Sequence, residues 1–582
     1  MASAGGLRGF GSRIARGAKA GSAFAGKALA DMSGRLGEGL LETVTIALLL
    51  LLAVVVSGLL ARLLPLPVPR PLFQIGFGAA IGLVADLRVS LDPEIFFVLF
   101  LPPLLFLDGW RIPREELAKD RIIIVELALG LVVVTVVGMG FFIHWMIPAM
   151  PLAVAFALAA IVSPTDPIAV SAIAQRVPIP KRMLHILEGE SLLNDASGLV
   201  CFRFAVAAAL TGSFSLSDAV LSFVWVAVGG LATGALLTFA VTRAKDWISD
   251  RVGEDTGSQI LISLLIPFGS YLLAEELGCS GILAAVAAGL AMSFAETSGR
   301  AMAVTRVRRS SVWDTIQYTA NGIIFVLLGE QLPAILARAR ESADVTGHGD
   351  PWWLVLYVVA ITLGLAALRF AWVWLSLGLT LLRRRDRRTS PSGRIVAAMS
   401  VSGVRGAVTL AGVLTLPLTL NDGTPFPARD LAILLAMGVI ILSLVAASFA
   451  LPLLLRGLEL PPEPSRQAEE DRARVAAAEA AIAEIGRFLQ SRAEEGRETD
   501  LHVAAASGII DFYRQRIDRL SGEGEAADLG LRAERIEREM RLAALKAERV
   551  ELFRRVRKRE LGSETARKLV RELDLLETRY AG

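Results

Sequence analysis

The sequence predicts an all-α polytopic membrane protein with about thirteen transmembrane helices and a soluble α-helical C-terminal tail. Hydrophobic residues make up 54% of the 582 residues and charged residues only 20%, whereas a soluble domain is typically about 25% charged. The apolar residues gather in about a dozen blocks, and roughly 20 such residues in a helix cross the hydrocarbon core of a bilayer. These observations exclude a soluble enzyme and a single-anchor receptor, and the long blocks argue against an outer-membrane barrel.

The remaining composition narrows the choice of partners. The 60 Lys and Arg residues against 57 Asp and Glu residues give a net charge of +3, which is too balanced to indicate a nucleic-acid partner. The two cysteines, Cys201 and Cys279, lie in or beside apolar segments, so we expect no disulfide framework. The four histidines are far apart in the sequence, and we therefore expect neither a resident metal site nor another cofactor.

A basic leader precedes the first apolar block. Residues 1–42 are rich in Gly, Ala and Ser, and they carry six Lys or Arg residues. We expect a disordered leader or an amphipathic basic helix at the membrane surface. A cleaved signal peptide is disfavoured because the apolar run that follows is too long.

Thirteen membrane segments follow, and the charges of their loops indicate an orientation. We expect these segments near 43–63, 71–86, 93–110, 121–147, 151–175, 184–210, 217–242, 258–277, 279–295, 312–336, 352–382, 394–418 and 428–455. The loops on one side hold 22 Lys or Arg residues and those on the other side hold four, so we predict that the basic side is cytoplasmic. An odd number of spans places the basic leader outside, which the same rule disfavours.

The fifth segment is predicted to break in mid-membrane. Pro164 and Pro167 flank Thr165 and Asp166, and each proline removes a backbone donor and clashes with the preceding turn. A break at this depth occurs only beside a cavity or an ion site, since the freed backbone groups need partners. A simple proline kink would explain the prolines but not the carboxylate of Asp166 between them.

The sixth segment supplies further oxygen atoms. Ser191 and Asp195 are one turn apart on one helix face, and Glu190 and Asn194 form the adjacent pair. Hard monovalent cations prefer oxygen ligands, and a carboxylate in a low dielectric also takes up a proton readily, because burial penalises its charged form. One site with two mutually exclusive occupants is the physical basis of proton-coupled exchange. The alternative is a set of polar residues bonded within the helix bundle.

The twelfth segment mirrors the fifth. Gly403 and Gly406 flank Arg405, so the helix propensity falls in mid-membrane. Interrupted helices at corresponding positions are a sign of an inverted-repeat transporter with its site at the midplane. Because an arginine cannot be neutralised, Arg405 needs a buried acid, and we predict a structural ion pair with Glu190.

Other ionisable residues lie within the apolar segments. Asp108, near the end of the third segment, is equally compatible with a helix-end or entrance-lining acid and with a role in the site. Arg203, Arg369 and Glu126 have no partner that the sequence identifies, and snorkelling to the membrane surface accounts for Arg203 and Glu126.

Five strings of residues occur in an order that a known family shares. They are Leu101-Pro102-Pro103, Thr165-Asp166-Pro167, Gly189-Glu190-Ser191-Leu192-Leu193-Asn194-Asp195, Ile324-Phe325-Val326-Leu327-Leu328-Gly329 and Gly403-Val404-Arg405-Gly406. Over roughly residues 40–455 they resemble the sodium/proton antiporters of the monovalent cation:proton antiporter family, of the NhaP/NHE type. The run from Glu188 to Asp195 is specific for this family, and the tail lies outside the resemblance.

The resemblance implies an architecture and a set of ligands. The family has thirteen helices, divided into a dimer domain and a six-helix core with two crossed discontinuous helices, and it works as a homodimer by alternating access. Asp195 resembles the residue that binds the ion and the proton. Asp166, Ser191 and Thr165, the last through its carbonyl, resemble further Na⁺ ligands.

The resemblance also assigns supporting residues. Asn194 is grouped with the ion- and proton-binding residues and resembles the residue that marks electroneutral one-for-one exchangers. The pairing of Glu190 with Arg405 resembles the family's structural ion pair. Asn321 stands where many animal members carry an acid, so a second ion pair is in doubt. Asp108 lies one position later than the acid of many members, which puts its direct role in doubt.

The predicted function is secondary active exchange of Na⁺ for H⁺ across the plasma membrane, electroneutral and by alternating access, with Li⁺ and K⁺ as further candidate cations. Two alternatives stay open. One is an intramembrane aspartyl protease that uses Asp166 and Asp195 as its acid/base pair. The other is a cation channel without proton coupling. A protease would have no use for the broken helix or for an arginine-bearing partner, so we expect a transporter rather than an enzyme.

The composition changes abruptly after the Pro-rich stretch at residues 460–464. Residues 465–582 are rich in Ala, Glu, Arg and Leu with helical spacing. We therefore divide the chain into a leader at 1–42, a transmembrane antiporter domain at 43–457 and a cytoplasmic helical tail at 465–582, used for regulation or dimerisation. The expected partners are monovalent cations, protons, membrane lipid and a second copy of the chain.

Overall fold

A computed structural model describes most of the chain and divides it into two compact units, Met1–Leu458 and Glu459–Gly582. The described residues are 44–64, 68–84, 93–112, 114–166, 170–171, 181–212, 216–296, 302–347, 350–384, 393–456, 466–494, 499–521 and 525–581. Within these ranges every regular element is a helix, and a single isolated β-bridge joins Thr419 to Pro425. The predicted leader, 1–42, lies outside the described residues.

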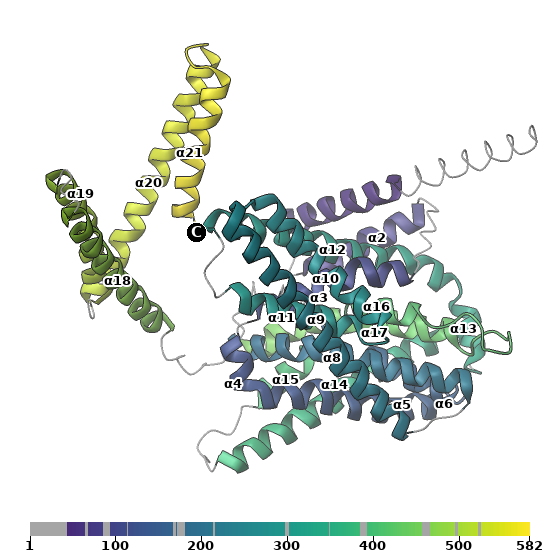
Figure 1. The fold of residues 1–582 in the computed structure, drawn as a ribbon. Helices are drawn as coiled ribbons and strands as arrows, with labels where there is room; N and C mark the ends of the chain where they lie inside the picture. Colours follow the sequence, from purple (N-terminus) through teal and green to yellow (C-terminus); the bar gives the residue numbers. More distant parts are fainter. Residues whose placement is uncertain are drawn as a thin grey trace, which may run out of the picture. The chain divides into compact units, whose positions relative to one another are not determined.

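The first unit is a bundle of helices (Figure 1), and most of them are apolar. After a helix at Val44–Leu63, its elements are α2 (Arg70–Val84), α3 (Pro93–Arg111), α4 (Arg114–Val125), the π-helix η1 (Glu126–Leu131), α5 (Val132–Met146), α6 (Leu152–Val162), α8 (Lys181–Thr211), α9 (Leu216–Val252), α10 (Thr256–Glu276), α11 (Gly281–Glu296), α12 (Ala303–Ala337), α13 (Ala339–Val345), α14 (Trp352–Arg384), α15 (Gly393–Val401), α16 (Ala407–Leu414) and α17 (Arg429–Leu455). Eight of the described helices are long and apolar enough to cross a membrane, and α2, α6 and α11 are shorter apolar helices.

The outward faces of these helices carry large apolar side chains. Leu48, Trp225 and Leu236 expose 61%, 65% and 68% of their surface. A soluble surface would not present such side chains in number, whereas a helix that faces lipid does so without cost. The fold is therefore that of an all-helical, multi-pass membrane protein.

Glycines bring several helices into close contact. A Cβ atom added at Gly78 of α2 would lie 1.9 Å from the Val326 carbonyl oxygen of α12, and the two helices lie side by side (Figure 1). A Cβ atom at Gly289 of α11 would lie 2.1 Å from the Phe106 carbonyl oxygen of α3. Small residues at such crossings let helix backbones approach, which drives packing in a membrane. The contact with α11 fixes the position of α3, the helix that carries Asp108.

The predicted interruptions of the fifth and twelfth segments are confirmed. Helix α6 ends at Val162, and residues 163–166 are not helical; residues 167–169 lie outside the described residues. In the twelfth segment α15 ends at Val401 and α16 begins at Ala407. The two interruptions meet, because the Asp166 amide donates a hydrogen bond of 2.7 Å to the Val404 carbonyl oxygen.

Three helices extend well beyond the predicted segments. Helix α12 begins at Ala303 rather than near 312, α4 begins at Arg114 rather than near 121, and α9 continues to Val252 rather than ending near 242. The added turns carry charged residues such as Arg306 and Asp250. Hydropathy marks only the part of a helix inside the hydrocarbon, so a helix that continues into water is longer than its apolar block.

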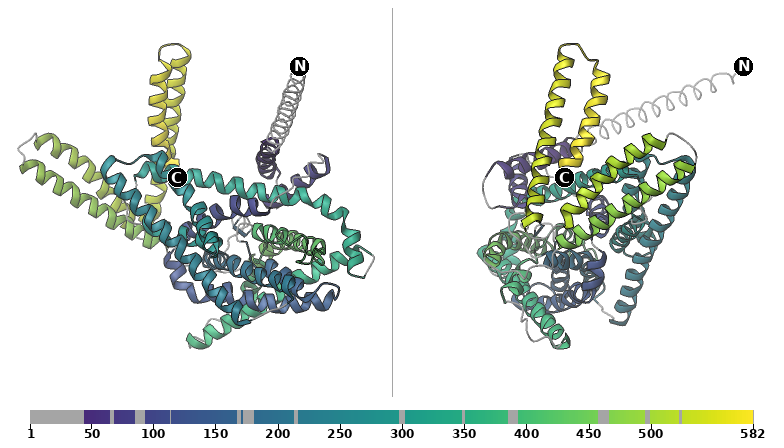
Figure 2. Two further views of the ribbon diagram at one scale, coloured as in Figure 1. Left: turned by 45° about the vertical axis from the view of Figure 1, so that its right-hand side comes forward. Right: turned by 90° about the vertical axis from the view of Figure 1, so that its left-hand side faces the viewer.

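The described residues of the second unit form four helices arranged as two hairpins (Figure 2). Helix α18 (Arg466–Glu494) pairs with α19 (Thr499–Ser521), and α20 (Glu525–Arg557) pairs with α21 (Ser563–Ala581). Ion pairs within one helix are common here; hydrogen bonds from Arg554 and Arg555 lower the pKa of the exposed Glu551 carboxyl to about 2. The helical content of the tail therefore follows from its charge pairs at helical spacing.

A candidate cation site at the meeting of two broken helices

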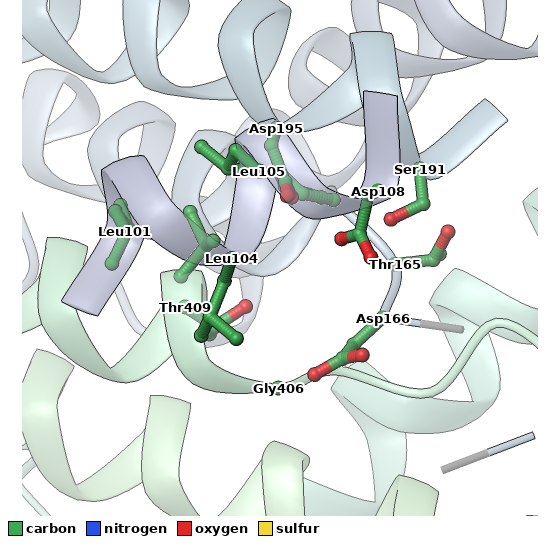
Figure 3. A pocket seen from close by; sticks show the side chains of 12 residues that line it. Leu101, Leu104, Leu105, Asp108, Thr165, Asp166, Ser191, Asp195, Gly406 and Thr409 are labelled. Atoms are coloured by element: carbon green, nitrogen blue, oxygen red, sulfur yellow. The ribbon is translucent and has the colours of Figure 1, made fainter. Parts of the chain in front are cut away.

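A small cavity lies where the two interruptions meet. Its volume is about 40 Å³, which exceeds the roughly 10–15 Å³ that one water needs and suits a cation with few or no waters. Helix α3, the interruption after α6, helix α8 and the start of α16 form its wall (Figure 3). The lining residues are Leu101, Leu104, Leu105, Asp108, Pro164, Thr165, Asp166, Ser191, Asp195, Gly406, Val408 and Thr409.

Three carboxylates line this cavity. Asp195 and Ser191 come from α8, Asp166 from the interruption after α6 and Asp108 from α3. Figure 3 shows the Asp108 side chain close to Ser191 and Thr165, between Asp195 and Asp166. The structure thus brings together Asp195, Asp166, Ser191 and Thr165, as the sequence predicts, and it places Asp108 on the same wall. Three carboxylates around one small volume attract a cation, because their mutual repulsion falls when a positive charge enters.

Asn194 and Glu190 lie behind this wall rather than on it. The Asn194 Nδ2 atom donates to the Thr165 hydroxyl at 3.0 Å and to Glu190 Oε1 at 3.5 Å. The Thr165 hydroxyl in turn donates to Glu190 Oε1 at 3.3 Å. Asn194 is therefore a residue that positions Thr165, and it is not among the residues that line the cavity.

Glu190 forms its ion pair with Arg369 of α14, and the predicted pair with Arg405 is wrong. The guanidinium of Arg369 donates to both carboxylate oxygens, with Nη2 2.6 Å from Oε2. Both side chains are at least 97% buried. The Arg369 Nε atom also donates to the Met399 carbonyl oxygen at the end of α15, so the pair ties α8, α14 and α15 together. A planar guanidinium that binds both oxygens is the strongest arrangement for a buried ion pair.

Arg405 instead binds backbone carbonyls at the two interruptions. Its Nε atom donates to the Val162 carbonyl oxygen at 2.8 Å, and its Nη1 atom donates to the Gly403 carbonyl oxygen. Both carbonyls are freed where α6 and α15 end. Freed carbonyls at membrane depth need donors, and one buried guanidinium supplies them to both broken helices. The need of these carbonyls for donors accounts for an arginine in mid-membrane, whose side-chain hydrogen bonds to the described residues go to backbone oxygens.

Other intramembrane charges also have specific partners. Glu126 accepts a hydrogen bond of 2.6 Å from the Ser376 hydroxyl of α14, and Arg203 lies 3.2 Å from Glu275 of α10. Glu126 therefore has a partner within the bundle, whereas Arg203 is about half exposed and its snorkelling to the membrane surface stays a prediction. Asn321, which lies on α12, is not among the residues that line the cavity.

Comparisons with known proteins agree with this geometry. The sequence model of the family described as "Sodium/hydrogen exchanger, transmembrane" matches residues 47–457, which is most of the chain. The chain belongs to the sodium/hydrogen exchanger family. Cation/proton exchange is therefore the activity class of this exchanger, and the family is one of transporters.

Similar proteins support the assignment of the exchanger to this family, and a solved structure shares its fold. It is 41% identical over 91% of its length to a protein of Escherichia coli named as the uncharacterized Na⁺/H⁺ exchanger YjcE, and the match covers 97% of that protein. It is 40% identical over 92% of its length to a sodium, potassium, lithium and rubidium/H⁺ antiporter of Bacillus pumilus, of which 78% is covered. Its fold is similar to that of the sodium proton antiporter MjNhaP1 from Methanocaldococcus jannaschii, with a TM-score of 0.52, 21% identity and coverage of 71% of this chain and 99% of that one.

The sequence did not reveal the partner of Arg369 or the position of Thr409 at the cavity. Arg369 lies 179 positions from Glu190, and no local pattern joins them. Thr409 lines the cavity in the first turn of α16, directly after the interruption that Gly403 and Gly406 predict. A hydroxyl residue just beyond a predicted break was the signal that could have identified Thr409.

Gly406 is predicted to be essential for exchange, because a side chain there meets Asp166. A Cβ atom at Gly406 would lie 1.7 Å from Asp166 Oδ2, so Gly406→Ala must displace the carboxylate. A shift of about 1 Å at a reaction site can cost roughly 100-fold in rate, and we expect a loss of roughly 10- to 100-fold in the exchange rate of vesicles. Gly393→Ala is the control, since a Cβ atom there has nothing within 4 Å. Equal rates for both variants would contradict the prediction.

Proposed function

We propose that the exchanger binds one Na⁺ or one H⁺ at Asp195 and exchanges them one for one by alternating access. The observation that supports this most directly is the group of three carboxylates, Asp108, Asp166 and Asp195, around one cavity at the meeting of the two interruptions. A buried carboxylate is stable either with a bound cation or with a proton, and it cannot hold both. Each occupant must therefore leave before the other binds, which couples the two fluxes.

The neighbouring residues complete the proposed site. Ser191 and Asp166 line the cavity with oxygen atoms, and Thr165 is held there by Asn194 and Glu190. The Thr165 hydroxyl is engaged in that network, so we assign the ligand role to its carbonyl. Li⁺ and K⁺ are further candidate substrates, and the name of the Bacillus pumilus relative adds Rb⁺ to them.

One-for-one stoichiometry rests on Asn194. Its amide donates to Thr165 and to Glu190, and an amide carries no exchangeable charge at any working pH. We propose that Asp195 alone loses a proton for each cation bound, so that exchange moves no net charge. The rate in vesicles should then be independent of a clamped membrane potential, whereas a strong dependence on potential would contradict this stoichiometry.

The larger assembly is also proposed. We place the exchanger in the plasma membrane as a homodimer whose two broken helices belong to inverted repeats, with lipid around it and residues 465–582 in the cytoplasm. The tail is proposed to regulate exchange. The family match gives no support to the alternatives of an intramembrane protease or an uncoupled channel.

Competition between Na⁺ and H⁺ tests the proposed function. In proteoliposomes that contain the purified full-length chain and an internal pH-sensitive dye, added Na⁺ should drive proton movement. As pH falls, a larger fraction of sites holds a proton, so the apparent KM for Na⁺ should rise, approaching about tenfold per pH unit. Sodium flux without proton movement would favour a channel, and an apparent KM that does not change with pH would contradict a shared site.

A further inference from the structure

The second broken helix contributes one side-chain oxygen to the cavity. Of its lining residues, Gly406 and Val408 carry none, and Thr409 carries a hydroxyl. Thr409 lies in the first turn of α16 and is 1% exposed. The cation ligands proposed above all come from α8 and from the interruption after α6, on the other side of the cavity.

The position of Thr409 suits a ligand. Figure 3 shows its side chain at the cavity, across from Thr165 and Ser191. Its neighbours Leu410 and Ala411 are apolar and buried in the core. A buried hydroxyl costs free energy unless a polar partner is close, and a cation in the cavity is such a partner.

We propose that the Thr409 hydroxyl is a cation ligand and that Thr409 sets the discrimination among alkali cations. This inference rests on the proposed function. A smaller ion binds each oxygen more strongly, since the interaction energy grows as the distance shortens, so loss of the hydroxyl penalises Li⁺ and Na⁺ more than K⁺ and Rb⁺. The methyl group of Thr409 occupies space in a cavity of only about 40 Å³, so its loss favours the larger ions.

Two variants separate the hydroxyl from the methyl group. Thr409→Val has nearly the same shape without the oxygen, and Thr409→Ser keeps the oxygen without the methyl group. In proteoliposomes at fixed pH, we expect Thr409→Val to raise the apparent KM for Na⁺ roughly tenfold or more, and that for Rb⁺ by less. We expect Thr409→Ser to lower the ratio of the Rb⁺ to the Na⁺ KM.

Thr415→Val is the matched control. Thr415 ends the same helix, and its hydroxyl donates to the Gly412 carbonyl oxygen at 2.7 Å, outside the cavity. The Thr415→Val variant should leave the ratios of the KM values for the four cations unchanged.

An equal rise in the apparent KM for Li⁺, Na⁺, K⁺ and Rb⁺ in Thr409→Val would indicate a structural role and overturn the inference. Unchanged KM ratios in Thr409→Ser would also overturn it. Absence of exchange by the wild-type protein would instead overturn the proposed function, so the two failures are distinguishable. Should Thr409→Val fail to fold, the Thr409→Ser ratios decide.

Discussion

Asparagine in place of Asp195 should abolish cation-driven proton movement while the protein stays folded. Asp195 lies within α8, exposes 7% of its surface and lines the cavity. The amide has the size of the carboxylate but carries neither the negative charge that binds a cation nor the proton that is exchanged. Repulsion from Asp108 and Asp166 is also relieved in the variant, so the thermal midpoint in detergent should not fall.

The measurement is the signal of a pH-sensitive dye inside proteoliposomes after addition of Na⁺, with the amount of folded protein checked by size-exclusion chromatography. Asp422→Asn is the control, because this exposed aspartate in the loop before α17 accepts hydrogen bonds from Thr424 and lies outside the cavity. The Asp422→Asn variant should show sodium-driven proton movement at the wild-type rate. Sodium-driven proton movement by Asp195→Asn at the wild-type rate would remove Asp195 from the mechanism.

Loss of either partner of the Glu190–Arg369 pair should destabilise the protein by about 3–5 kcal/mol, because it leaves a buried charge without its partner. Glu190→Gln leaves the Arg369 guanidinium uncompensated, and Arg369→Met does the same to the Glu190 carboxylate. The double variant Glu190→Gln/Arg369→Met removes both charges, so its loss in free energy of unfolding should be well below the sum of the two single losses.

Thermal and denaturant unfolding in detergent measure these changes. Glu190→Gln combined with Arg405→Met is the comparison, because Arg405 contacts the carbonyl oxygens of Val162 and Gly403 instead of Glu190. The losses in free energy of unfolding from Glu190→Gln and Arg405→Met should be nearly additive, because only a weaker long-range attraction joins the two charges. A large coupling energy between Glu190 and Arg405, with none between Glu190 and Arg369, would restore the pairing that the sequence predicts.

The parts of the site that were predictable are those fixed by local chemistry. Pro164 and the glycines beside Arg405 weaken a helix wherever it lies, so both interruptions follow from a few consecutive residues. Ser191 and Asp195 share a helix face whatever the helix packs against. The fold class likewise follows from apolar blocks of sufficient length.

The parts that were not predictable depend on how distant helices meet. Arg369 and Arg405 are both intramembrane arginines, and the sequence does not give the rotation of α14 or α15 relative to α8. Assigning Arg405 to Glu190 assumed that an arginine must face an acid, but freed backbone carbonyls serve it equally well. Asn194 was grouped with the ion-binding residues through the resemblance, but its side chain is turned by about 100° from that of Asp195 and contacts Thr165 and Glu190.

The hydrogen bond from the Asp166 amide to the Val404 carbonyl joins the backbones of the two broken helices where they meet. Arg405 adds a second bridge between the ends of the same two helices. Because these contacts couple the two broken helices, we expect a shift of one to carry the other, together with Asp166 and Thr409. We therefore expect the cation to meet the same ligands from either side of the membrane. The ion gradients alone then decide the direction of net exchange, and reversing them should reverse it.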